Sequence, residues 1–320
     1  MKNFIIPTSQ TEHLARNILK RTKPSTRAKL GAGLVPPRNK VSGAGNFEVI
    51  FPDLSRDGKR YFPDGEIYMR ILKAKKLQGS RVIVLYSGAP KPNEGLTELE
   101  LILQILRDNN IKPEVFFTYF PYGMQDKVFK KGETNVAENL VEKLINYYKV
   151  KKIYIIDPHF GGRKWVRKYP IISISAIPSL IKKAKEDFAA RNILFLSPDK
   201  GGQRRTKISG FRKKRYDSFS VKILSPKINL NGKIVAVTDD MVKTGGTLVK
   251  FAEFAEQSGA KKILALITHG VIPAGISKIK KKYSKLYLTN TIKQKESNVD
   301  ITDLTLKTLS DYNPPTHHPI

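Results

Sequence analysis

The pattern of hydrophobic and polar residues predicts two kinds of element that alternate along the chain. Short apolar runs rich in β-branched residues are typical of strands buried on both faces of a parallel sheet. Between them, apolar residues recur at positions i, i+3, i+4 and i+7, the spacing of a helix that covers one face of a sheet. The expected strands cover residues 82–86, 114–120, 152–157, 192–197, 233–238 and 262–268, and the expected helices cover residues 93–109, 134–148, 176–189 and 246–258.

This alternation predicts an α/β protein with two parallel sheets, each flanked by helices. The length of 320 residues suits two domains of ~100–200 residues each. We expect a first domain at 1–163, a second at 164–290 and a tail at 291–320. Residues 22–46 are rich in Pro, Gly and Lys, which indicates a loop. The cleft between two such domains is a usual place for a ligand.

The absence of cysteine excludes disulfides, thiolate metal ligands, iron–sulfur clusters and cysteine nucleophiles. Apolar runs fall short of the ~18–20 residues of a membrane span. The first residues turn polar after six positions, which is too short for the apolar region of a signal peptide. We therefore expect a soluble, cytoplasmic protein with no membrane partner.

The chain carries 58 Lys and Arg residues against 28 acidic ones, a formal charge of +30. Such an excess repels itself unless anions lie close by. Nucleic acid, phosphorylated small molecules, anionic membrane surfaces or a salt-rich cytosol would all satisfy this electrostatic requirement. The lysine-rich run at 278–285 is interpreted as the solvated end of a helix, because aromatic residues do not recur in it at the spacing that base stacking needs. Nucleic acid stays open as a partner but is not favoured.

The segment most specific for chemistry is VAVTDDMVKTGGT at 235–247. A strand ends at Asp239 and Asp240, and a turn then opens a helix. The turn consists of Thr244, Gly245, Gly246 and Thr247. Its glycines let backbone N–H groups point inward, and the helix N-terminus adds a positive partial charge, so a phosphate monoester fits there. The two carboxylates can accept hydrogen bonds from the vicinal hydroxyls of a sugar, directly or through a divalent cation. The sequence therefore predicts a sugar-phosphate site.

This segment resembles the fingerprint of the phosphoribosyl-diphosphate (PRPP) binding fold, shared by type I phosphoribosyltransferases and ribose-phosphate pyrophosphokinase (PRPP synthetase). Five other segments resemble elements of the synthetase in the same order: FPDGEIYMRI at 62–71, YGMQDK at 122–127, DPH at 157–159, SPDKGG at 197–202 and THGV at 268–271. The first two favour the synthetase family over the transferases. The resemblance implies two phosphoribosyltransferase-like domains.

The resemblance also implies a reaction: Mg²⁺-dependent transfer of the diphosphoryl group of ATP to the 1-hydroxyl of ribose 5-phosphate, giving PRPP and AMP. It assigns the ribose hydroxyls to Asp239 and Asp240 and the 5-phosphate to the turn at 244–247. The implied diphosphate loop is Asp199, Lys200, Gly201 and Gly202. The implied catalytic residues are Lys213, Arg215 and His159, and the implied metal ligands are His159 and Asp199. The implied ATP-binding residues are Phe62, Asp64, Glu66, Gln125 and Asp126.

In this family the segment matching 62–71 completes the ATP site of a neighbouring subunit, so a homo-oligomer is implied. One departure from the family is Met124, which stands where the synthetases usually carry an arginine that contacts ATP. Lys127, Lys130 and Lys131 could supply the missing charge. These departures leave three alternatives open: a catalytically silent, synthetase-like regulatory subunit, a PRPP-sensing nucleic-acid-binding regulator, and a transferase that uses PRPP and a base.

Overall fold

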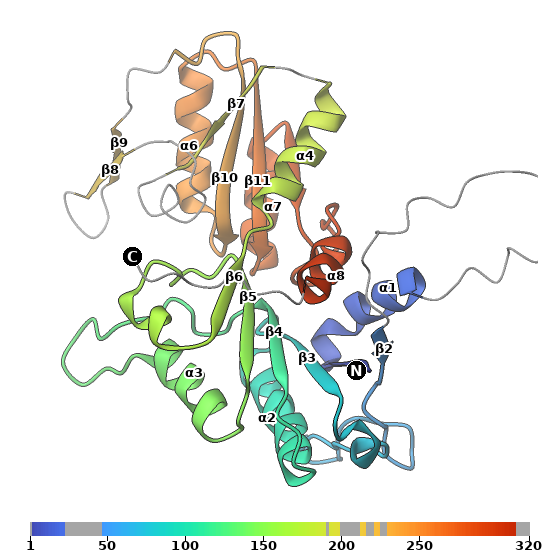
Figure 1. Ribbon diagram of the computed structural model, residues 1–320. Coiled ribbons are helices and arrows are strands. Elements are labelled where there is room, and N and C mark those ends of the chain that lie inside the picture. Colours follow the sequence, from blue (N-terminus) through green and yellow to red (C-terminus); the bar gives the residue numbers. More distant parts are fainter. Residues whose placement is uncertain are drawn as a thin grey trace, which may run out of the picture.

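Two parallel sheets, each packed between helices, make up the described part of the molecule (Figure 1). The computed structural model describes residues 2–22, 47–189, 192–198 and 229–311, and the backbone alone of two short strands at 212–215 and 221–224. This confirms the predicted α/β class with helix-flanked parallel sheets. Figure 1 shows the second sheet above the first.

The first sheet has six parallel strands in the order β2-β1-β3-β4-β5-β6. The strands are β1 (Asn3–Pro7), β2 (Phe47–Val49), β3 (Arg81–Ser87), β4 (Glu114–Tyr119), β5 (Lys152–Ile156) and β6 (Ile171–Ile174). Helices α2 (Pro92–Asp108) and α3 (Val136–Asn146) cover one face of this sheet, and α1 (Glu12–Thr22) and α8 (Thr302–Ser310) cover the other. Every residue of β3 and β4 is buried, as expected for strands covered on both faces.

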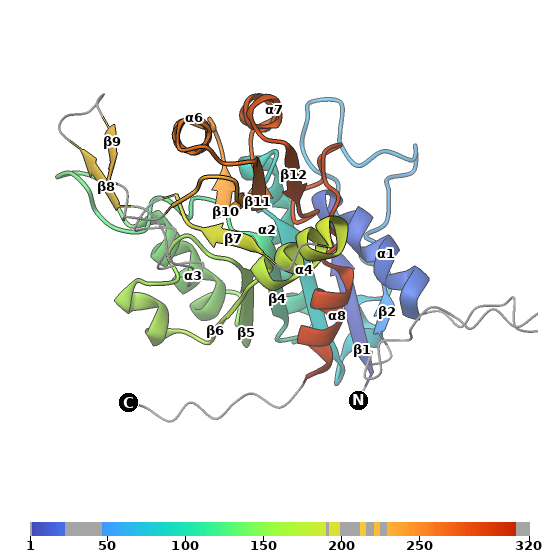
Figure 2. The same ribbon diagram turned by 90° about the horizontal axis from the view of Figure 1, so that it is seen from above.

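The second sheet has four parallel strands in the order β12-β11-β10-β7. The strands are β7 (Ile193–Leu196), β10 (Ile234–Val242), β11 (Lys262–Gly270) and β12 (Lys285–Leu288). Helices α6 (Gly246–Gln257) and α7 (Pro273–Lys282) pack on one face and α4 (Ile177–Phe188) on the other, as Figure 2 shows from above. An antiparallel pair, β8 (Arg212–Arg215) and β9 (Val221–Leu224), completes the strands of the described residues.

All six strands and four helices expected from the hydrophobic pattern are present. The first sheet continues past residue 163, the end expected for the first domain, because β6 pairs with β5. Part of the expected tail is structured: Ile301, Leu306 and Leu309 are buried against the first sheet. Most of the expected loop at 22–46 lies outside the described residues. Among those described, no helix is both long and apolar enough to cross a membrane.

Candidate active site

Three polar contacts join the end of β5 to the ends of β10 and β11. His159 Nδ1 lies 2.8 Å from Asp240 Oδ2. Thr268 Oγ1 donates to Asp157 Oδ2 at 2.7 Å, and His269 Nε2 lies 3.1 Å from the carbonyl oxygen of Ile156. Parallel sheets bind ligands at the carboxyl ends of their strands, and here the carboxyl ends of both sheets meet. The DPH and THGV segments and the carboxylate pair are thus brought to one place.

The contact between His159 and Asp240 fixes how the imidazole is presented. The side chain of Asp240 is 2% exposed, and an ionised carboxylate can only accept hydrogen bonds. The proton of a neutral His159 is therefore placed on Nδ1, which leaves the Nε2 lone pair available. Nε2 has no hydrogen-bond partner among the described residues, and the His159 side chain is 26% exposed. This nitrogen can therefore bind a metal or, when protonated, a phosphate oxygen.

Asp157 turns the chain between β5 and His159. Its backbone has a φ of 37°, in the left-handed region that Asp adopts more readily than most residues. Its carboxylate also accepts from the N–H of Ala176 at 3.0 Å. Burial raises the pKa of this carboxyl to about 6, although the bond from Thr268 opposes the rise. Asp157 thereby connects β5 to the start of α4 and the end of β11.

The turn that follows β10 opens a helix, as the sequence predicts. Gly245 has a φ of 76°, a left-handed conformation that favours glycine, and α6 begins at the next residue. A Cβ on Gly246 would meet no atom within 4 Å. A Cβ on Gly275 would lie 1.9 Å from the carbonyl oxygen of Lys243, so the backbone of α7 packs directly against this turn. Burial lowers the pKa of Lys243, and the charge of Asp240 opposes this.

Asp239 and Asp240 are successive residues of one strand, and successive side chains of a strand point to opposite faces. The N–H of Asp240 donates to Asp239 Oδ1 at 3.0 Å. Both carboxylates are buried, 9% and 2% exposed. Asp240 contacts His159, an interaction that the sequence did not predict. The two acids therefore have different surroundings although the sequence treats them as a pair.

The loop at 122–127 lies next to His159, because Gly123 and His159 line the same cavity. Within it, Asp126 is 3% exposed and accepts two bonds from Arg163, from Nε at 2.6 Å and from Nη2 at 2.9 Å. Its carboxylate is therefore occupied by an ion pair. The side chain of Gln125 is exposed, and the backbone N–H of this residue donates to the backbone carbonyl of Tyr122.

The other predicted ATP-binding residues lie on a separate hairpin. Phe62, Asp64 and Glu66 are exposed, and the N–H of Glu66 donates to Asp64 Oδ1 at 3.0 Å. The hairpin is attached near α1 and α2 through Arg60. No described contact joins it to His159 or Asp240, so this chain does not bring the two groups together.

Several predicted site residues lie outside the described residues, namely Asp199, Lys200, Gly201 and Gly202. Lys213 and Arg215 belong to β8, of which only the backbone is described. The strand before the diphosphate loop is placed, however. Leu196 pairs with Val237, and Thr238 Oγ1 donates to the carbonyl of Leu196 at 3.2 Å. Residues 197 and 198 therefore leave the second sheet at the same edge as Asp239.

The described residues were tested as holders of the divalent cation that the family implies. They contain no group of three His, Asp or Glu side chains arranged to hold a metal ion. Mg²⁺ usually keeps several waters and takes only one or two protein carboxylates together with substrate phosphates. The Nε2 atom of His159, on the side of the ring away from Asp240, fits such a partial site as a single protein ligand.

Sequence reasoning did not single out Arg163, the Asp157 carboxylate, Thr268 or His269 for the contacts that they make. Thr268 and His269 belong to the THGV segment and Asp157 belongs to the DPH segment, so the motifs indicated these positions but not the contacts between them. Arg163 belongs to none of the motifs, so its ion pair with Asp126 could not be predicted from them.

Comparisons with known proteins match most of the chain to one family. Residues 53–148 match the model of the N-terminal domain of ribose phosphate pyrophosphokinase. Residues 221–310 match the model of the phosphoribosyl synthetase-associated domain. The ribose-phosphate pyrophosphokinase of Pyrococcus abyssi is 31% identical over 284 residues, which are 83% of this chain and 95% of that protein. The protein of the same name from Pyrococcus furiosus is 33% identical over 253 residues, 75% and 87% of the two chains.

One solved structure covers almost the whole chain. The phosphoribosylpyrophosphate synthetase from Mycobacterium smegmatis superposes with a TM-score of 0.76 at 20% identity, over 97% of this chain and 98% of that one. At this identity the likeness concerns the fold, and it confirms two phosphoribosyltransferase-like halves.

Proposed function

Because this chain belongs to the ribose-phosphate pyrophosphokinase family, we propose that it transfers the diphosphoryl group of ATP to the 1-hydroxyl of ribose 5-phosphate, giving PRPP and AMP. The observation that carries the proposal is the contact between His159 and Asp240. It joins the DPH segment of the first sheet to the sugar-phosphate loop of the second. The pentose and the polyphosphate would then meet at the carboxyl ends of β5 and β10.

In this mechanism the second sheet binds the acceptor sugar. The N–H groups at the start of α6 and the hydroxyls of Thr244 and Thr247 hold the 5-phosphate, since the helix N-terminus favours an anion. Asp239 accepts hydrogen bonds from the ribose hydroxyls, and Asp240 does so while it orients His159. These contacts place the 1-hydroxyl toward the space beside His159. Fixing that geometry supplies much of the catalysis of a phosphoryl transfer.

The donor polyphosphate lies on the other side of the acceptor. The amides of the loop at 199–202 hold the diphosphoryl group that is transferred. Arg215 neutralises non-bridging phosphate oxygens through two parallel bonds, and Lys213 acts as a point charge. The attacking 1-oxygen forms a bond to the β-phosphorus, the bond from that phosphorus to the bridging oxygen of AMP breaks, and the hydroxyl proton is released to solvent.

Mg²⁺ would be held by His159, with Asp199, and when bound it supplies positive charge to the ATP phosphates. The remaining neutralisation comes from side chains of this chain. Lys127, Lys130 and Lys131 are exposed on the loop after Met124, and we assign to them the phosphate contact that the arginine makes in other synthetases.

The proposal includes a homo-oligomer in which the hairpin at 60–68 completes the ATP site of a neighbouring subunit. It is supported by the exposure of Phe62, whose ring is 45% exposed, and by the lack of described contacts between that hairpin and His159. Phe62 stacks on the adenine, while Asp64 and Glu66 accept hydrogen bonds from its exocyclic amine or neighbouring donors.

The test is incubation of the purified protein with ATP, Mg²⁺ and ribose 5-phosphate, followed by measurement of AMP. We expect AMP release that requires both the sugar phosphate and the metal, with an equal amount of PRPP. Ribose without its 5-phosphate is the matched control and should give little AMP, because it leaves the phosphate loop empty. Absence of sugar-dependent AMP with ATP as donor would reject the proposal in favour of a silent subunit.

A further inference from the structure

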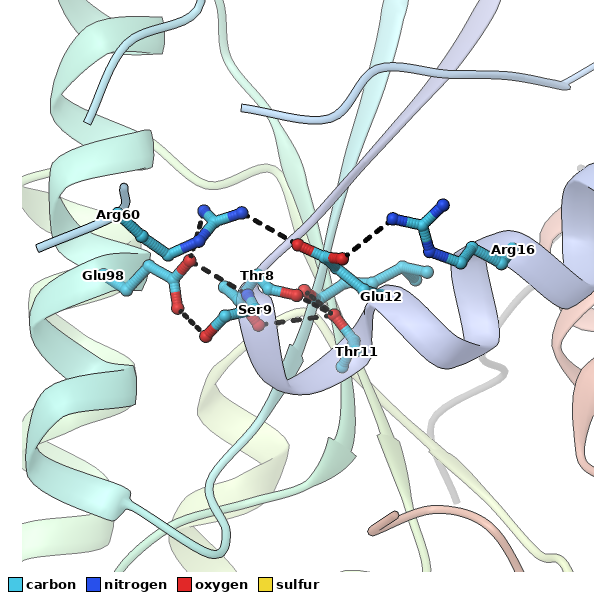
Figure 3. A network of polar contacts seen from close by, with 8 residues as sticks. Thr8, Ser9, Thr11, Glu12, Arg16, Arg60 and Glu98 are labelled. Carbon is cyan, nitrogen blue, oxygen red and sulfur yellow. Dashed lines mark hydrogen bonds and ion pairs between the residues drawn. The ribbon is translucent and has the colours of Figure 1, made fainter. Parts of the chain in front are cut away.

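An ion-pair network anchors the hairpin at 60–68 to the rest of the first domain. Arg60 Nη1 donates to Glu98 Oε1 at 3.1 Å, and Nη2 donates to Glu12 Oε1 at 2.8 Å. Glu12 belongs to α1 and Glu98 to α2, so a single guanidinium connects the hairpin to two helices. Figure 3 shows Arg60 lying between the two carboxylates.

The network is buried at its centre. The side chains of Arg60 and Glu98 are 12% and 3% exposed. Glu98 also accepts from the N–H of Ser9 at 2.9 Å and from the Ser9 hydroxyl at 2.6 Å. Every carboxylate oxygen of Glu98 is therefore engaged. Hydrogen bonds to a charged, buried group hold their geometry more strongly than exposed ones.

Arg60 stands at the base of the hairpin, and the residues at its tip are exposed. Its carbonyl accepts from the N–H of Tyr68 at 2.8 Å, and Tyr61 pairs with Ile67. All residues from 61 to 66 are exposed, whereas Ile71 on the far side of the hairpin is buried. The orientation of the tip is thus set from its base, with Arg60 on one strand and the chain leading to Ile71 on the other.

From this geometry we infer that Arg60 is a positioning residue for the nucleotide: its bridge between Glu12 and Glu98 sets the direction of the hairpin that carries Phe62, Asp64 and Glu66. The inference rests on the proposed function, because it needs ATP as the ligand of that hairpin. Arg60 itself does not contact the nucleotide. A lysine has a single ammonium nitrogen and lacks the rigid pair of nitrogens that reaches the two carboxylates here.

The test compares variants by their affinity for a non-hydrolysable ATP analogue, measured by calorimetry, and by their KM values. Arg60→Met should weaken analogue binding and raise the ATP KM by about tenfold, with the KM for ribose 5-phosphate changed less than about twofold. Hydrogen exchange at the N–H groups of Phe62 and Tyr68 should become faster. Arg16→Met is the matched control, because Arg16 bonds the other oxygen of Glu12, Oε2, and lies over the ring of Phe51, and its side chain is 63% exposed. This variant should behave like the wild type.

A double variant separates positioning from stability. Arg60→Met alone leaves the buried Glu98 carboxylate without its cation, which destabilises the fold. Arg60→Met combined with Glu98→Gln removes that charge and should regain most of the lost melting temperature, while the ATP KM stays raised. Recovery of ATP affinity together with stability would overturn the inference, as would an unchanged affinity in Arg60→Met. If the wild type makes no PRPP, the proposed function fails; analogue binding and hydrogen exchange still decide the role of Arg60.

Discussion

At the scale of single residues, the two adjacent acids at the end of β10 have different surroundings. Asp240 is nearly fully buried and contacts His159, while Asp239 lies on the opposite face of the strand. Asp239→Asn should therefore raise the KM for ribose 5-phosphate by about tenfold, which is the effect of weakening a charge-assisted hydrogen bond. Steady-state kinetics with each substrate varied would check this. A larger effect on the KM for ATP would contradict the assignment of the sugar.

Lys213 and Arg215 are assigned to charge that develops on the transferring phosphoryl group. Contacts that strengthen in the transition state act on kcat, so each alanine variant should lower kcat by about 10²–10³ with a smaller change in KM. Lys214→Ala is the matched control on the same strand and should retain activity. A change confined to KM would assign these residues to ground-state binding.

At the scale of elements, the hydrophobic pattern predicted the strands that are buried on both faces of a sheet. Runs such as 82–86 and 262–268 are buried on both faces, so they carry an unbroken apolar signal. The signal fails at β6, which is only partly buried, and at the three-residue strand β2. Helix α8 was also missed. It packs in the core that contains β1, which depends on a contact between the two ends of the chain and not on local sequence.

The candidate site also divides into a part that local sequence predicts and a part that depends on contacts between elements. Motifs singled out the turn at 244–247, the carboxylate pair and His159, because each is a short segment with its own conformational requirement. The pairing of Asp240 with His159 and of Asp126 with Arg163 could not be predicted, since each joins residues on different elements. Asp126 shows this most clearly: it is a motif position that the resemblance assigns to ATP, and both oxygens of its carboxylate accept bonds from the partly exposed Arg163.

The close approach of α7 to the phosphate loop gives a prediction for an element contact. Gly275→Ala would place a methyl group 1.9 Å from the carbonyl oxygen of Lys243, although alanine favours a helix. The loop must shift, so we expect a loss of about 1–3 kcal/mol in stability and a higher KM for ribose 5-phosphate. Gly162→Ala is the control, because its Cβ would meet no atom within 4 Å. Thermal unfolding and kinetics of both variants test the contact, and a stabilised Gly275→Ala variant would disprove it.

At the scale of the whole molecule, the polar contacts between the two sheets make stability depend on pH. Burial lowers the pKa of His269 to about 4, although the charge of Asp240 opposes this. Its two nitrogens contact Thr291 and the carbonyl of Ile156. The unfolded chain therefore binds this proton more readily than the folded protein, and the contribution of His269 to stability is lost as the pH falls from 6.5 toward 4.

A His269→Gln variant isolates this contribution. Asp157, whose carboxyl has a pKa raised to about 6 by burial, acts in the opposite direction over the same range, so the wild type alone would not isolate the contribution of His269. The difference in unfolding free energy between wild type and variant should shrink by up to about 3 kcal/mol between pH 7 and pH 4. Chemical denaturation at each pH measures it. A difference that does not vary with pH would contradict the burial of a neutral His269.

The central claim concerns where the whole molecule binds its acceptor: the meeting point of the two sheets, with the sugar phosphate held at the end of β10. A crystal structure of the protein with ribose 5-phosphate tests this most directly. We predict the phosphate on the N–H groups at the start of α6 and the ribose hydroxyls against Asp239 and Asp240. Binding of the pentose phosphate at any other strand end, with the turn at 244–247 left empty, would contradict the account.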